Sequence, residues 1–340
     1  MSKTVYAAAP TRVDFAGGTL DIYPIFLFFD GGKTINAAID LDAQVWITAR
    51  DDNRITIRSE DIPYSLESEG GVAGLPDHKE LALIIRVLRF YKPEGGMDIV
   101  TKLQPPHGSG LGASSALFVA LSHAILAFMG HDRSDTERII RVSNALEAQL
   151  MGMPAGMQDY YPPTYGGICA VHYDLEDIWV EALDTDGSFI DELQHYLIVS
   201  YTNITHHSGT TNWGYMRNYF DKVPETAASL KRIKEIAEHT YSTFKAKDIR
   251  GIATLLDEEW QHRRNLSDDV TTPEIERMMQ AALQAGAWAN KLCGAGGGGC
   301  MITMAPPETR DQVITALEAN GATVMSAKLV TDGVTITVTE

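Results

Sequence analysis

The most constraining feature of the sequence is a glycine- and serine-rich loop at residues 105–116, PPHGSGLGASSA, which opens directly into an apolar helix. Its closely spaced glycines, Gly108, Gly110 and Gly112, allow backbone amides to approach a ligand. The start of the following helix adds N–H groups without a partner in the helix and the positive end of its dipole. This arrangement suits phosphate groups, and a serine at the junction of loop and helix can bind Mg²⁺.

The loop departs from two familiar phosphate-binding patterns. A Walker A motif requires a lysine after its last glycine, and this loop has none. The dinucleotide-binding GxGxxG pattern is matched only in its relaxed form, and Pro105 and Pro106 separate the loop from the strand expected before it. On the loop alone, a phosphate site, an oxidoreductase and a plain helix entry capped by serines all stay open.

Composition excludes several classes of partner. The chain has 340 residues with 28 Lys and Arg against 45 Asp and Glu, a net charge of −17, so it lacks the basic surface that nucleic acid or an anionic membrane requires. Its three cysteines form no CxxC pair, and no apolar run approaches ~20 residues. We therefore expect a cytoplasmic protein with buried, unpaired cysteines and with no nucleic-acid or membrane partner.

Hydrophobic periodicity predicts a mixed chain. Strands are expected at 34–41, 43–50, 54–59, 96–103, 166–173, 178–184 and 195–202. Helices are expected at 78–92, 115–129, 134–151 and 308–320, with two or three more between 211 and 286. Ser134 and Glu137 predict a capping box for the third of these helices. A strand–glycine-run–strand segment is expected at 287–305, and a terminal β pair at 322–330 and 334–340.

Because strands and helices do not alternate regularly, an α+β fold is favoured over a doubly wound parallel sheet. The length leaves room for about two domains. A change from helical to strand-rich sequence places the predicted division at residues 1–180 and 181–340.

Three segments in series resemble the signature motifs of the GHMP kinases: PTRVDFAGGTLD at 10–21, PPHGSGLGASSA at 105–116 and CGAGGGGC at 293–300. A fourth segment, NALEAQLMGMPAGMQDYYPPTYGG at 144–167, resembles the branch of heptose kinases and fucokinases. The chain reads GGTLD where that branch usually reads GGTD or GWTD, a departure that bears on the substrate.

This resemblance implies an N-terminal domain like ribosomal protein S5 domain 2 and a ferredoxin-like C-terminal domain, with ATP and substrate in the cleft between them. It further implies an ATP- and Mg²⁺-dependent kinase that phosphorylates a hydroxyl of a sugar or sugar phosphate, with a heptose, a heptose phosphate or a related hexose preferred. A mevalonate-type or other small-polyol kinase and a non-catalytic ATP-binding protein are the alternatives. A homodimer is left open.

The resemblance also assigns roles to individual residues. Asp159 corresponds to the carboxylate that faces the acceptor hydroxyl, and Arg12 to the basic residue beside it. Ser115 and Glu147 correspond to the Mg²⁺ ligands. The expected ATP loop consists of Pro106, Gly108, Ser109, Gly110, Leu111, Gly112, Ala113, Ser114 and Ser115. The expected substrate residues are Gly18, Thr19, Asp21, Gly296, Gly297 and Ser208.

Each of these assignments has a plainer alternative. Glu147 could be an exposed carboxylate on an amphipathic helix, and Asp21 a helix N-cap. The glycine run at 294–299 could be a tight hairpin, a reading compatible with its motif role. Segment 205–213, THHSGTTNW, is interpreted as a substrate-side loop or a simple helix entry, because adjacent histidines such as His206 and His207 rarely bind one metal ion together.

Overall fold

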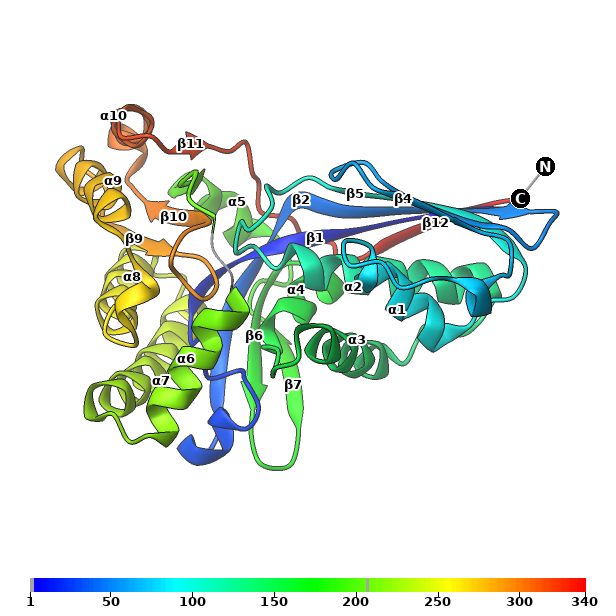
Figure 1. The fold of residues 1–340 in the computed structure, drawn as a ribbon. Helices are drawn as coiled ribbons and strands as arrows, with labels where there is room; N and C mark the ends of the chain where they lie inside the picture. The colour runs from blue at the N-terminus through cyan, green and yellow to red at the C-terminus, as the bar shows by residue number, and fades with distance from the viewer. Residues whose placement is uncertain (1–2, 206–207) are drawn as a thin grey trace.

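The computed structural model describes residues 3–205 and 208–340, with side chains described throughout except at 208–211. Two β-sheets organise the chain, one in each half of the molecule (Figure 1). Helices cover both sheets, so the architecture is the predicted mixture of α and β rather than a doubly wound parallel sheet.

The larger sheet is formed mainly by the first half of the chain. Six of its strands follow the order β12-β1-β2-β5-β3-β4, and β6 pairs with both β2 and β7. Every pairing is antiparallel except that of β3 with β5. The strands are β1 (Thr4–Ala16), β2 (Gly32–Arg50), β3 (Ile55–Ser59), β4 (Ser65–Ser68), β5 (Gly96–Leu103), β6 (Ile168–Tyr173), β7 (Ile178–Ala182) and β12 (Thr335–Thr339). The predicted strand 96–103 coincides with β5.

The two strands predicted at 34–41 and 43–50 are one continuous strand, β2. Its first half pairs with β6 and its second half with β5, so one long strand serves two different neighbours. In the second half, Ala43, Val45 and Ile47 are buried while the residues between them are only partly buried. This alternation shows that one face of the sheet is packed.

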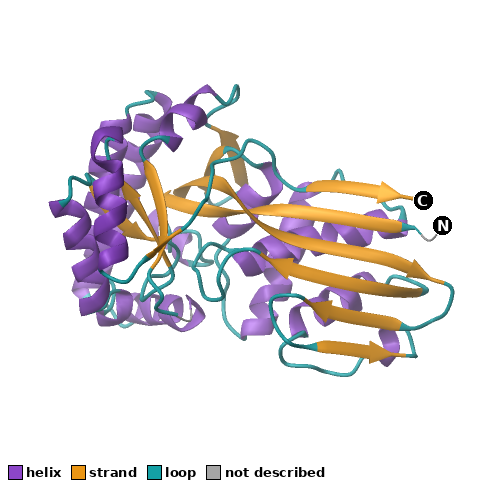
Figure 2. Ribbon diagram, turned by 90° about the horizontal axis from the view of Figure 1, so that it is seen from above, coloured by secondary structure: helices purple, strands orange, loops and turns teal. Residues whose placement is uncertain are grey.

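Helices α1 (Ala82–Tyr91), α2 (Ala113–Met129) and α3 (Thr136–Met151) cover that face, as Figure 2 shows. A short helix, α4 (Tyr161–Tyr165), precedes β6. Helix α2 is buried along nearly its whole length, with Phe118 in the core, which explains why its sequence is apolar all round. This burial confirms a core helix rather than a membrane span, and none of the described helices has the length and apolar character that a span requires.

The predicted capping box of α3 is wrong. Asp135 is the N-cap, and its side chain accepts a hydrogen bond from Arg138 N at 3.0 Å. Ser134 instead donates its amide and hydroxyl to Asp132 in the preceding turn. The hydroxyl is therefore already used in a local turn of the kind that Asp residues form with the backbone just after them.

The smaller sheet has the order β11-β8-β10-β9 and is antiparallel throughout. Its strands are β8 (Leu197–Tyr201), β9 (Ala289–Leu292), β10 (Cys300–Met304) and β11 (Thr323–Val324). The helices of this half are α5 (Ser188–Gln194), α6 (Ser208–Phe220), α7 (Pro224–Lys245), α8 (Ile249–Arg263), α9 (Pro273–Gln284) and α10 (Arg310–Ala319). In the described part of this segment four helices, not two or three, lie between β8 and β9, because the chain turns near Lys222, near Lys247 and again over 264–272.

The predicted terminal β pair is also wrong. Strand β11 pairs with β8 in the smaller sheet, whereas β12 crosses back and pairs with β1, so that the two chain ends lie side by side (Figure 1). β1 would otherwise present an open edge, which β12 covers. The division at 180/181 stays a prediction, and the larger sheet also includes this C-terminal strand.

The C-terminal segment packs against the turn after α4 on its way back to the larger sheet, and this contact can be tested by its effect on stability. Gly166 follows α4 with φ +72°, and a Cβ there would overlap the backbone of Asp332 and Gly333. Gly130 follows α2 with φ +70°, and a Cβ there would meet nothing within 4 Å. We expect Gly130→Ala to cost about 1 kcal/mol for the left-handed backbone, and Gly166→Ala at least about 3 kcal/mol because overlap is added.

The measurement is the urea midpoint of unfolding for both variants beside the unmodified protein. A larger shift for Gly166→Ala is the expected result, and equal shifts would show that segment 331–333 does not pack against this turn.

Candidate active site

A cleft of about 730 Å³ runs past the glycine-rich loop, and it is lined by residues of both halves of the chain. All residues of the predicted ATP loop line it except Leu111. Leu111 is fully buried in the core, and its carbonyl oxygen accepts a hydrogen bond from Arg12 N at 3.1 Å. One face of the loop therefore lines the cleft, and Leu111 on the other face fixes the loop to the core and to β1.

The loop has the backbone geometry expected of an anion site. Gly108, Gly110 and Gly112 all have φ near +70°, a region that other residues rarely adopt. Gly112 ends the loop, and α2 begins at Ala113 without a side-chain cap. The first amides of α2 therefore lack an intrahelical acceptor, and they lie where Ser114 and Ser115 line the cleft.

Arg12 and Asp159 form the central ion pair of the cleft. The guanidinium donates to Asp159 Oδ1 from Nε at 2.8 Å and from Nη2 at 2.6 Å, and to the carbonyl oxygen of Gly110 at 2.6 Å. A Cβ at Gly112 would lie 3.3 Å from Asp159 Cβ, so the third glycine leaves room for this pair. The structure thus joins two predicted catalytic residues that lie 147 positions apart.

The ion pair lies largely out of water. Arg12 is 1 % exposed, yet Asp159 and Asp14 outweigh its burial and raise the pKa of the guanidinium. Burial raises the pKa of Asp159, while Arg12 opposes that rise. The result is a charged pair whose carboxylate is held ready to accept a proton.

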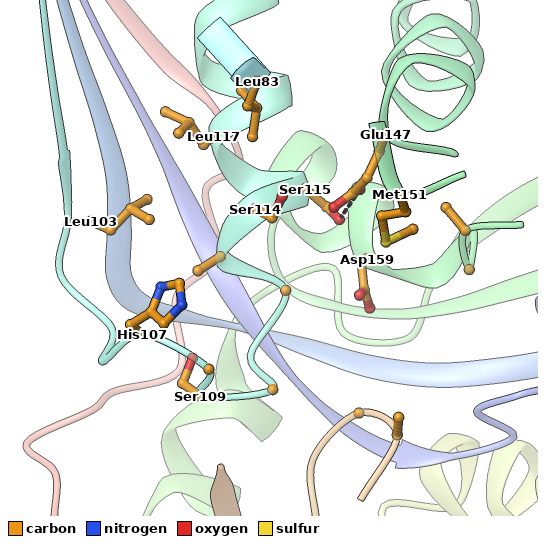
Figure 3. A pocket seen from close by; sticks show the side chains of 18 of the residues that line it. Leu83, Leu103, His107, Ser109, Ser114, Ser115, Leu117, Glu147, Met151 and Asp159 are labelled. Carbon is orange, nitrogen blue, oxygen red and sulfur yellow. Dashed lines mark hydrogen bonds between the residues drawn. The ribbon is translucent and has the colours of Figure 1, made fainter. Parts of the chain in front are cut away.

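Ser115 and Glu147 lie together at the start of α2, as predicted. Ser115 Oγ donates to Glu147 Oε2 at 2.8 Å (Figure 3). The Tyr160 hydroxyl donates to the same oxygen. Glu147 is buried rather than on an exposed helix face, and burial raises its pKa. It is paired with hydroxyls and with no described cation, which is the environment of a carboxylate that could bind one.

Asp21 is buried and lines the cleft within reach of the charge of Asp159. Its two oxygens accept hydrogen bonds from Thr19 N at 2.9 Å and from Gln158 N at 3.1 Å. Burial, with a contribution from the charge of Asp159, raises the pKa of Asp21 to about 6. Asp21 is not the N-cap of the short helix that follows, which begins at Ile25 after Pro24.

The remaining predicted substrate residues divide into three groups. Thr19 lines the cleft with Asp21. Gly18, Gly296 and Gly297 do not line it: Gly297 N donates to the carbonyl of Val270 at 2.6 Å, and the cleft is reached instead by Gly294 and Ala295. The side chain of Ser208, like His206 and His207, lies outside the described residues, although Asn212 from the same helix lines the cleft.

The glycine run also forms the hairpin that the plainer interpretation expected. β9 and β10 pair in antiparallel fashion on either side of it. Cys293 and Cys300 flank the run, are free and are fully buried. Burial raises the pKa of Cys293 to about 12, so this thiol is a packed small residue rather than a nucleophile, as predicted.

Sequence reasoning missed the apolar end of the cleft. This end is lined by Ile62, Leu81, Leu83, Ile84, Leu103 and Leu117, with Ser59, Asp61 and Thr101 beside them. Figure 3 shows Leu83, Leu103 and Leu117 on one side of the loop, and Glu147 and Asp159 on the other. These residues come from α1, α2, β5 and the loop after β3, and no local motif marks them.

A group of buried charges behind the cleft was also missed. Asp14, Glu259, Arg263 and Lys291 are at most 1 % exposed. Lys291 bonds to the Asp14 carboxylate, and Arg263 Nη2 lies 3.3 Å from Glu259 Oε1. Glu259 and Arg263 are four residues apart on α8, a spacing that places them on one helix face, and this is the only signal in the sequence that could have linked them.

Comparison with known proteins places this site in a family. The family model described as the GHMP kinases N terminal domain matches residues 81–167, and the model described as GHMP kinases C terminal matches residues 240–323. The chain belongs to the GHMP kinases. Together the two matched regions contain the loop, Glu147, Asp159, the buried charges of α8 and the glycine run.

The relatives extend over the whole chain. A D-glycero-alpha-D-manno-heptose 7-phosphate kinase of Campylobacter jejuni is 27% identical, with 98% of each chain covered. A mevalonate kinase of Thermococcus onnurineus is also 27% identical with 98% of each chain covered. The crystal structure of a D-glycero-D-manno-heptose 1-phosphate kinase from Bacteriodes thetaiotaomicron has a TM-score of 0.79 at 25% identity over 98% of each chain. The predicted family, two-domain fold and kinase activity are confirmed.

The geometry of the ion pair leads to a kinetic prediction for this GHMP kinase. Replacing Asp159 by Asn removes the proton acceptor beside Arg12 but preserves its shape, so kcat should fall by about 10²- to 10⁴-fold. ATP binding should be almost unchanged, since the loop amides stay in place. Steady-state kinetics and calorimetric titration with ATP measure the two quantities.

The matched control is Asp191→Asn, because Asp191 is exposed on α5 and does not line the cleft. That variant should keep the kcat of the unmodified enzyme. If Asp159→Asn kept it as well, Asp159 would not be the proton acceptor.

Proposed function

We propose that this enzyme transfers the γ-phosphate of ATP to a hydroxyl group of a sugar or sugar phosphate, with a heptose or heptose phosphate as the preferred acceptor. The observation that carries the proposal is that two carboxyls, the buried Asp21 and the half-buried Asp159, line the same cleft as the loop. Carboxylates accept hydrogen bonds from hydroxyl donors, which a sugar carries in number. The heptose kinase names of two similar proteins agree with this choice.

The cleft provides separate regions for the parts of ATP. Its apolar end, with Leu83, Leu103 and Leu117, suits a nucleobase. The 108–115 loop and the start of α2 suit the phosphates. The terminal phosphate would then lie between the loop and Asp159, so that an acceptor hydroxyl at Asp159 is in line for transfer.

The residues at Ser115 and Glu147 fit a Mg²⁺ ion. Mg²⁺ is usually held by one or two protein oxygens in addition to waters and substrate phosphates, and Ser115 Oγ and Glu147 Oε2 supply two. The burial of Glu147 without a described cation is the observation that favours this assignment. When bound there, Mg²⁺ supplies positive charge to the phosphates of ATP.

The chain's own residues perform the remaining steps. Asp159 orients the acceptor hydroxyl and accepts its proton as the phosphoryl group leaves ATP. Arg12 keeps Asp159 ionised and lies close enough to the loop to stabilise charge on the phosphoryl group in transfer. No step requires a covalent intermediate on the protein.

The alternatives are less well supported. A mevalonate-type acceptor offers two hydroxyls, fewer neutral donors for the carboxyls of Asp21 and Asp159 than a sugar offers. A non-catalytic ATP-binding protein would not need the Arg12–Asp159 geometry. The cytoplasmic location remains a prediction, supported by three free cysteines. Nucleic acid and membranes are not expected partners.

A panel of acceptors tests the proposal directly. D-glycero-D-manno-heptose, its 7-phosphate, L-fucose, D-galactose and R-mevalonate are each incubated with enzyme, ATP and Mg²⁺, and ADP release is measured. We expect turnover on one of the sugars, with the heptose or its 7-phosphate the fastest, and no turnover when EDTA replaces Mg²⁺. Turnover on mevalonate alone would overturn the sugar assignment, and ADP release with none of the acceptors would overturn the sugar-kinase proposal as a whole.

The raised pKa of Asp21 predicts a pH dependence specific to the acceptor. Below about pH 6 the carboxyl gains a proton, so one of its acceptor oxygens becomes a donor and the kcat/KM for the sugar should fall. The KM for ATP should stay constant, because Asp21 lies away from the loop. In Asp21→Asn, whose side chain does not titrate, this decline should be missing from an already lowered profile. Identical pH profiles of the two proteins would contradict the role of Asp21.

A further inference from the structure

Gln158 is a buried polar residue whose side chain the catalytic scheme does not use. It is 6 % exposed and lines the cleft next to Asp159. Its side-chain oxygen Oε1 has no hydrogen-bond partner among the described residues. A buried acceptor left without a donor costs free energy, so a native structure retains one where a ligand or water supplies the missing donor.

The position of Gln158 is fixed from two sides. Its backbone amide donates to Asp21 Oδ2 at 3.1 Å. Upstream in the same segment, the carbonyls of Ala155 and Gly156 both accept from Asn144 Nδ2 on α3 at 3.2 Å. The backbone of 155–158 is therefore held between α3 and Asp21, and the side chain of Gln158 starts from a rigid point.

Gly18 makes room for that side chain. A Cβ at Gly18 would lie 3.2 Å from Gln158 Nε2 and 2.6 Å from Arg263 Nη2. The carboxamide thus lies over the turn that precedes Thr19 and Asp21, in the acceptor end of the cleft. Gly18, which does not line the cleft itself, contributes to this end by the absence of a side chain.

The polar groups around Gln158 favour a ligand group that is neutral and donates hydrogen bonds. Asp21 accepts hydrogen bonds, and the Oε1 of Gln158, which has no described partner, adds a second acceptor among the residues that line the cleft. Among the described lining residues Arg12 is the one arginine and none is a lysine, and Arg12 is already bonded to Asp159 and Gly110. A hydroxyl group satisfies such a pair of acceptors better than a phosphate would.

Resting on the proposed function, we propose that Gln158 determines acceptor specificity by accepting a hydrogen bond from a sugar hydroxyl adjacent to the one that is phosphorylated. Gln158 and Asp159 both line the cleft, so the two side chains can bind two hydroxyls of one acceptor. An acceptor without that second hydroxyl leaves Oε1 buried and unpaired, and it is discriminated against for this reason.

The test is a cycle of variants and substrates. Gln158→Leu keeps the size of the side chain and removes its polar atoms. The probes are D-glycero-D-manno-heptose 7-phosphate and its 2-, 3- and 4-deoxy derivatives, or the corresponding deoxy series of L-fucose or D-galactose if the acceptor panel selects that sugar. The quantities measured are kcat/KM for each acceptor, the KM for ATP and the thermal unfolding midpoint. Gln149→Leu, at an exposed glutamine on α3, is the matched control.

We expect Gln158→Leu to lower kcat/KM for the full acceptor by about 10- to 100-fold and to leave the KM for ATP within about twofold. With one deoxy derivative the two enzymes should be equal, because the interaction is already absent. Gln149→Leu should match the unmodified enzyme with every probe.

Two contrary outcomes are distinguishable. If the unmodified enzyme is active and Gln158→Leu lowers kcat/KM equally for every probe, Gln158 has a structural role and this inference is wrong while the proposed function stands. If the unmodified enzyme phosphorylates none of the sugars, the proposed function fails and the inference fails with it.

Discussion

The active site depends on four buried charges that join the two halves of the chain. Asp14 lies on β1, Glu259 and Arg263 on α8, and Lys291 on β9. Their side chains also hold the backbone around the cleft. Gly294 N donates to Asp14 Oδ1 at 2.9 Å, Gly17 N to Glu259 Oε2 at 2.8 Å, and Arg263 Nη2 to the Gly18 carbonyl at 2.8 Å. The first and third glycine segments are thus anchored to one set of charges.

Such a cluster is weak evidence for stability, because removing charges from water costs about as much as their attraction returns. The cluster of buried charges instead fixes the geometry of the backbone around the cleft. Two positive and two negative side chains neutralise one another. Burial raises the pKa of Asp14, but Lys291, Arg12 and Arg263 together outweigh it and lower that pKa. Because each charge has a defined partner, the turns at 17–19 and 294 have one arrangement, and Thr19 and Gly294 are placed accurately at the wall of the cleft.

β1 connects this cluster of buried charges to the Arg12–Asp159 ion pair. Residues 12 and 14 are two apart on an extended strand and so point to the same side. Arg12 bonds to Asp159, and Asp14 bonds to Lys291. The negative charge of Asp14 also helps to raise the pKa of Arg12. The position of Arg12, the arginine proposed to act in catalysis, is therefore set by the same strand that anchors the two halves.

The sequence predicted what is local and left out what depends on distant contacts. Glycine spacing and apolar periodicity are local properties of a sequence. They therefore sufficed to predict the loop at 105–116, strand β5 and the core helix α2. Arg12 and Asp159 were paired only through the resemblance to a family, since nothing in either segment indicates the other. The pairing of β12 with β1, the inward position of Leu111 and the apolar end of the cleft depend on contacts between segments far apart in the chain, which periodicity does not encode.

The net charge of −17 bears on how the cleft can bind its ligands. An acidic protein repels a polyanion at long range, so ATP must be held by short-range devices, and the cleft offers the amides at the start of α2 and the guanidinium of Arg12. The acceptor end contains carboxyls instead. Asp159 raises the cost of ionising Asp21, and this cost is lowest when the group that enters is neutral and donates hydrogen bonds. The division of the cleft into a phosphate-binding end and a hydroxyl-binding end therefore follows from where the few positive groups lie.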